Sequence, residues 1–104
     1  MIYLKERFVK GGIEYTQVFK DEELVIYCLK QKHQDDDGYS EWYEVFQLKI
    51  KQPDIYHNDE FEKYPGDEAF GFWAWSCSNE KCVLKVLKKN FPKHAIPTWL
   101  AEYA

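Results

Sequence analysis

The feature that most constrains the fold is the stretch of residues 64–91, where an apolar segment leads directly into a capped amphipathic pattern. Phe70–Cys77 places Phe70, Phe72 and Ala74 on one side and Trp73, Trp75 and Cys77 on the other. Both sides are apolar, as in a strand that is covered on its two faces. Gly71 has no side chain to pack, so it permits a bulge or a close approach of backbone.

The segment after this strand carries the signals of an amphipathic helix. Ser78 and Asn79 are good N-cap residues, and Glu80 suits the positive end of a helix. Pro92 ends the pattern. The apolar residues that follow the cap recur at helical spacing, namely Val83, Leu84, Leu87 and Phe91.

The first part of the chain predicts a β-hairpin. Ile2–Val9 alternates, with Glu6 as the interruption on its apolar side. Gly11 and Gly12 then offer the positive φ angles that a tight turn needs. Ile13–Lys20 is expected to return as the second strand, with Ile13, Tyr15 and Phe19 facing inward.

Two further strands are expected in the middle of the chain. Leu24–Leu29 is apolar on both faces and β-branched, which is typical of a central strand. Asp37 and Gly38 mark a turn, and Glu41–Lys51 then alternates. This pattern predicts a half-buried strand with one solvated face.

Residues 52–68 form the longest stretch without clear periodicity. A long loop is one interpretation, and a short helix around Asp59–Tyr64 is the other. At the end of the chain, residues 98–103 predict one or two helical turns that dock Trp99 and Leu100.

The order of elements predicts a single α+β domain over residues 1–104. We expect an antiparallel meander of roughly five strands, with the C-terminal amphipathic helix packed on one face. The chain is 45% hydrophobic and 31% charged, which is typical of a globular protein, but 18% of its residues are aromatic. That excess indicates that the other sheet face is aromatic enough to bind a partner.

The charge pattern disfavours general binding to nucleic acid or to an anionic membrane, because the formal net charge is −4. The charge is unevenly distributed. Residues 1–78 hold nine basic and sixteen acidic residues, whereas residues 79–104 hold five and two. No signal-peptide pattern and no long apolar segment is present, so we expect a cytoplasmic protein without a membrane partner.

Three cysteines do not form a disulfide framework, and their spacing is a poor match to a zinc site. Cys77 and Cys82 lie on either side of the predicted helix start, without the tight pair that zinc usually has. Cys82 in the first helical turn would favour a thiolate, but no base or oxyanion site accompanies it. We therefore expect no metal, no cofactor and no catalytic cysteine.

Two acidic stretches suggest weaker alternatives. The run of residues 35–38 resembles the start of a calcium loop, but the distant bidentate glutamate is missing. The acids of residues 54–68, together with His57, allow a metal-dependent hydrolase as a hypothesis. No motif supports that chemistry, so the sequence favours a non-enzymatic protein.

The leading hypothesis is a small binding protein that uses an aromatic sheet surface to hold a protein partner, including a second copy of itself. The residues expected to carry it are Trp73, Trp75 and Tyr43. The alternative is a nucleic-acid-binding accessory protein that uses the lysine-rich helix through Lys81, Lys85 and Lys88.

Overall fold

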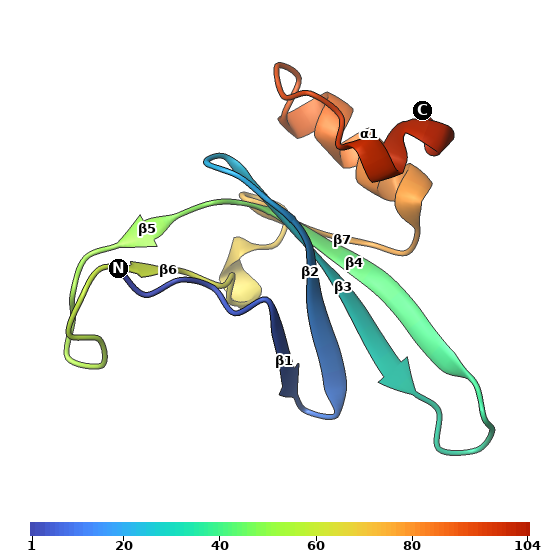
Figure 1. The fold of residues 1–104 in the computed structure, drawn as a ribbon, viewed down its shortest axis with the longest axis horizontal. Coiled ribbons are helices and arrows are strands. Elements are labelled where there is room, and N and C mark those ends of the chain that lie inside the picture. The colour runs from blue at the N-terminus through green and yellow to red at the C-terminus, as the bar shows by residue number, and fades with distance from the viewer.

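A computed structural model describes residues 1–104 and confirms the α+β prediction (Figure 1). A five-stranded antiparallel sheet has the order β1-β2-β3-β4-β7, and the C-terminal helix α1 contacts β4 and β7. A separate two-stranded sheet pairs β5 with β6. The elements are β1 (Arg7–Lys10), β2 (Ile13–Lys20), β3 (Leu24–Lys32), β4 (Tyr39–Gln47), β5 (Ile50–Lys51), β6 (Phe61–Glu62), β7 (Ala74–Cys77), α1 (Glu80–Asn90) and the 3₁₀ helices η1 (Asp67–Ala69) and η2 (Thr98–Tyr103).

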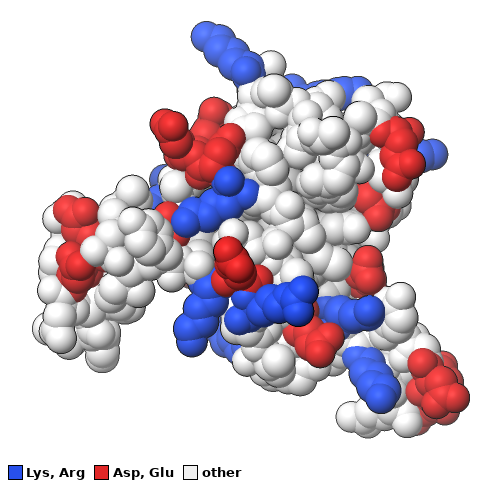
Figure 2. All heavy atoms as spheres, viewed as in Figure 1, with Lys and Arg blue, Asp and Glu red and all other residues white.

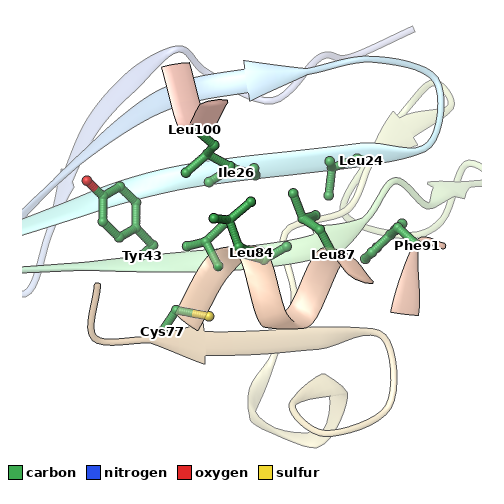
Figure 3. Packing of buried hydrophobic residues seen from close by; sticks show 10 residues of the cluster. Leu24, Ile26, Tyr43, Cys77, Leu84, Leu87, Phe91 and Leu100 are labelled. Carbon is green, nitrogen blue, oxygen red and sulfur yellow. The ribbon is translucent and has the colours of Figure 1, made fainter. Parts of the chain in front are cut away.

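Strand β3 is central, as its apolar pattern predicts, and both of its faces are buried. Leu24 and Ile26 point towards α1, while Val25, Tyr27 and Leu29 point to the opposite face. Figure 3 shows the layer between α1 and the sheet, where helix and sheet side chains meet. The buried residues of this layer are Leu24, Ile26, Tyr43, Val45, Cys77, Val83, Leu84, Leu87, Phe91 and Leu100.

The helix begins and ends where the sequence predicts. Asn79 is the N-cap, and its side chain accepts a hydrogen bond of 2.9 Å from the backbone N–H of Cys82. Phe91 closes the other end, and η2 then returns Leu100 to the core. His94 joins this tail to the turn between β2 and β3 through a side-chain contact with Asp21.

The face opposite α1 is filled by aromatic side chains from the chain itself. Tyr64 lies at its centre, with ring centroids 5.2 to 5.7 Å from Phe8, Tyr15, Tyr27 and Phe46. Tyr27 and Phe46 are inaccessible to solvent. Much of the aromatic excess is therefore used inside this layer.

The predicted N-terminal hairpin is confirmed, but two details of it are wrong. Gly11 and Gly12 adopt φ angles of 58° and 76°, as their turn requires. The first strand covers only Arg7–Lys10, because the chain before it leaves the sheet. Phe19 faces α1 rather than the side of Ile13 and Tyr15, because a bulge shifts the register between Gln17 and Phe19.

Two other strand predictions need correction. The segment Glu41–Lys51 is not one strand with a solvated face, because β4 ends at Gln47 and α1 covers Tyr43 and Val45. Phe70–Cys77 is strand only from Ala74, because Gly71 has a φ of 89° and forms a turn. The turn places Trp73 on the face of Ala74 and leaves Phe72 exposed.

Residues 49–63 form a projection that we call the arm. Figure 1 shows it extending from the sheet, with β5 and β6 at its base and the N-terminal segment beside β6. Ile2 forms a parallel bridge with Phe61, which extends the small sheet. Of the two interpretations of residues 52–68, the short helix around Asp59–Tyr64 is wrong, because Phe61 and Glu62 pair with β5 instead.

Candidate interaction surface

The most exposed large apolar side chains of the molecule lie at the end of the arm. Ile55 is 89% exposed and Tyr56 is 83% exposed. Both belong to residues 52–60, which we call the arm tip. Large apolar residues that stay in water without covering anything are typical of an interaction site when they cluster.

A network of hydrogen bonds fixes the turn that presents Ile55 and Tyr56. Asp54 Oδ1 accepts from the backbone N–H groups of Tyr56 and His57, each at 2.8 Å. His57 Nδ1 lies 3.0 Å from the same oxygen, and this contact, with the backbone bonds, holds the pKa of Asp54 below its usual range. The backbone N–H of Asp54 also donates to the carbonyl of His57 at 3.0 Å. The two exposed side chains therefore stand on a preorganised turn.

The His57 ring connects this turn to the base of the arm. It stacks on Phe61, with ring centroids 3.8 Å apart and an interplanar angle of 13°. Both rings line a groove of about 450 Å³ between the arm and the N-terminal segment. The other residues of the groove are Tyr3, Leu4, Lys5, Phe8, Glu62, Lys63 and Tyr64.

Glu62 anchors the base of the arm to the sheet. Its side chain is only 4% exposed, and its Oε1 accepts from the backbone N–H of Leu4 at 2.8 Å. Lys20 of β2 forms an ion pair with the same oxygen. A buried carboxylate needs such partners, so these contacts tie β6, β2 and the N-terminal segment together.

Tyr64 continues the attachment into the aromatic layer. Its hydroxyl donates to Glu44 of β4, and burial together with this bond raises the pKa of Tyr64. Burial also raises the pKa of Glu44, although the bond from Tyr64 acts against the rise. The arm thus begins at a well-packed part of the sheet and ends in an exposed tip.

The residues that the sequence predicts for an aromatic surface lie on different faces. Tyr43 lies beneath α1, stacked 5.7 Å from Trp99, and its hydroxyl donates to Glu80 at 2.9 Å. Trp75 is half-buried on the same face, with its ring edge against Phe91. Trp73 packs on the opposite face beside Phe46, so the structure does not bring the three side chains together.

The lysines of the alternative hypothesis do lie together. Lys81, Lys85 and Lys88 are exposed along the outer side of α1, with Lys89 next to them. Their spacing places them on one stripe, opposite the buried Val83 and Leu87 of the same helix.

Cys77 and Cys82 are neighbours, but neither the cysteines nor the acids of residues 54–68 gather into a larger group of possible metal ligands. The pKa of Cys77 is raised by burial and by the neighbouring Cys82 thiol, and burial raises the pKa of Cys28 to about 11. The raised pKa values keep the thiols of Cys28 and Cys77 protonated. Within residues 54–68, Asp54 serves the tip turn and Glu62 serves the base, so their carboxylates do not converge. No group of three or more His, Cys, Asp or Glu side chains is placed to hold a metal ion.

Comparison of the chain with protein-family models, curated proteins and solved structures finds no match. None of the helices combines the length and the apolar character that crossing a membrane requires.

Sequence reasoning missed Ile55 and Tyr56. The signal that could have found them is a pair of large apolar residues between Pro53-Asp54 and His57-Asn58, in a segment otherwise rich in polar and turn-forming residues. Such a pair inside a polar stretch has no periodic partner with which to build a core.

Proposed function

We propose that this is a small non-enzymatic binding protein that holds a protein partner with its arm tip. The observation that carries this proposal is the exposure of Ile55 and Tyr56 on a turn ordered by Asp54 and His57. An aromatic anchor and an aliphatic one, held in place before binding, are the features of an interface hot spot.

The packing of the sheet supports the arm tip over the aromatic sheet face as the binding surface. Tyr27 and Phe46 are fully buried, and Tyr64 occupies the centre of their layer. A partner could reach these rings only by displacing Tyr64 and the side chains packed around it, such as Phe8 and Tyr15. Binding at the tip requires no such rearrangement of the body.

Site-specific photo-cross-linking of the full chain in its own cells tests this proposal. A photoreactive amino acid replaces Ile55 in one variant and Phe72 in a matched control, because both positions are highly exposed but lie on different loops. We expect a discrete cross-linked protein product from position 55 and none from position 72. The absence of a product at position 55, or the same products at both positions, would contradict the proposal.

A further inference from the structure

The outer side of α1 offers a basic surface whose charges have no partners within the molecule. Lys81, Lys85, Lys88 and Lys89 are exposed, and none of them takes part in an ion pair. We call these four residues the lysine stripe. Residues 79–104 as a whole carry five lysines against two glutamates. This surface therefore attracts an acidic ligand at short range.

The arm tip has the complementary chemistry. It contains Asp54, Asp59 and Glu60 and no lysine or arginine, and Asp59 forms an ion pair with the N-terminal ammonium group, so the formal charge of the tip with that group is −2 with His57 neutral. Its exposed Tyr56 ring can receive a lysine ammonium group over its face. The exposed Ile55 can pack against the methylene stems of the same lysines.

A single molecule cannot bring these two surfaces together. Figure 1 shows the arm and α1 on different sides of the sheet, and the longest dimension of the molecule is 42 Å. In Figure 2, acidic side chains gather on the arm at the left, while basic side chains project from the upper edge where α1 lies. Contact between the surfaces therefore needs two molecules.

We propose that the arm tip of one copy docks on the lysine stripe of a second copy. This inference rests on the proposed function, since it identifies the partner of the arm tip. The contact joins two different surfaces, so it can repeat head to tail into a chain or close into a ring, of which the smallest is a two-fold dimer with two reciprocal contacts. The contact involves only a small turn and one helix face, so we expect weak, salt-dependent association.

The charges favour an acidic protein segment over nucleic acid as the ligand of the lysine stripe. The whole chain carries a net charge of −4, which repels a long polyanion as it approaches. A short acidic turn brings only a few charges and places them beside the stripe alone. The arm tip also supplies apolar contacts that a phosphate backbone lacks.

Sedimentation velocity of the full chain, with two charge-reversal variants, tests the inference. One variant carries Gln52→Lys, Asn58→Lys and Glu60→Lys on the arm tip, where none of the three side chains holds the turn of Asp54 or the ion pair of Asp59. The other carries Lys81→Glu, Lys85→Glu and Lys88→Glu, which change the formal charge of the stripe from +4 to −2. Each variant is measured alone and in an equal mixture, over a concentration series at low and high salt.

We expect the average mass of the unmodified chain to rise with concentration, and its apparent dissociation constant to increase at least about ten-fold between roughly 50 and 500 mM NaCl. Each variant alone should remain monomeric, because its two surfaces now repel each other. The mixture should associate again, since the basic arm of one variant faces the acidic helix of the other. Recovery in the mixture also shows that both variants are folded.

Three outcomes would overturn the inference. They are a chain that stays monomeric at all concentrations, a mixture that does not recover, and a stripe that retains single-stranded DNA without any self-association. A cross-link from position 55 to a different protein would also overturn it while leaving the proposed function intact. No cross-link at position 55 would remove the proposed function itself.

Discussion

In the sheet, the largest apolar side chains lie between two packed layers, whereas in the arm tip they face water. Tyr27 and Phe46 are fully buried, and each contributes roughly 2–3 kcal/mol of transfer free energy. Ile55 and Tyr56 contribute almost none, and their turn depends on the hydrogen bonds of Asp54. The body is thus held by burial and the tip by local polar contacts. Changes in the body should alter stability, and changes in the tip should alter binding.

The largest effect is expected from Phe46→Ala. Phe46 packs among the rings of Tyr27, Tyr64 and Trp73, so its loss leaves a cavity that rigid neighbours cannot fill. The free energy of unfolding should fall by about 4 kcal/mol, measured by urea denaturation. The exposed Phe72 provides the control, since Phe72→Ala should change stability by less than about 0.5 kcal/mol. Equal losses in both variants would remove the contrast between buried and exposed aromatic residues.

The substitution Glu62→Ala at the base of the arm should lower the free energy of unfolding by a smaller amount, about 2 kcal/mol. It removes a charged hydrogen-bonded group and leaves Lys20 without its partner. In this variant the backbone amides of Leu4 and of position 62 should exchange with solvent faster, as measured by hydrogen exchange. The neighbouring Glu60→Ala should leave both quantities unchanged. If Glu62→Ala also did so, the arm would be attached by its backbone pairing alone.

The smallest effect should come from two of the three His–Asp pairs, His94–Asp21 in the body and His57–Asp54 in the tip. Burial alone would lower the pKa of His94, but Asp21 raises it above 6.5. The stability that the protonated His94 ring contributes to the fold is therefore lost as pH rises through the raised pKa. Burial acts to raise the pKa of Asp21, yet hydrogen bonds from Glu23, Leu24 and His94 lower it below 3.8. The contribution of Asp21 is therefore lost as pH falls through that lowered value. The pair stabilises the fold most between about pH 4 and 6.5.

Unfolding of His94→Ala at two pH values measures this contribution. We expect a loss of about 0.5 kcal/mol near pH 5.5 and a much smaller loss near pH 9. His57→Ala should leave global unfolding unchanged, because its partner Asp54 is only three residues away in an exposed turn. A pH-independent loss in His94→Ala would mean that the ring acts by packing against Phe19 instead.

The sequence predicts those parts of the fold that depend on local patterns. The central strand at Leu24 and the helix capped by Asn79 follow from apolar periodicity and cap chemistry, and both are confirmed. Phe19 and Trp73 lie on the face opposite to the one that the alternation predicts, because one bulge and one glycine turn change the alternation. The strand of Phe61 and Glu62 depends on pairing with β5, which leaves no signal in a short window of the sequence.

The candidate site was less predictable than the fold for a related reason. Aromatic content indicates how many rings a chain has, but not which of them the chain itself will cover. Tyr64 fills the sheet face that the sequence left open, while the exposure of Ile55 and Tyr56 depends on how far the arm projects. Whether either surface binds a partner remains a prediction.

The bulge in β2 has a consequence for how the chain tolerates changes in length. Val18 is the residue without a partner on β3, so the strand contributes Ile13 and Tyr15 to one layer and Phe19 to the other. The inside and outside positions of β2 therefore exchange at Val18. Substitution or loss of Val18 leaves Gln17 opposite Tyr27 and Phe19 opposite Ile26, whereas loss of a paired residue of β2 would exchange the inside and outside positions on one side of the deletion.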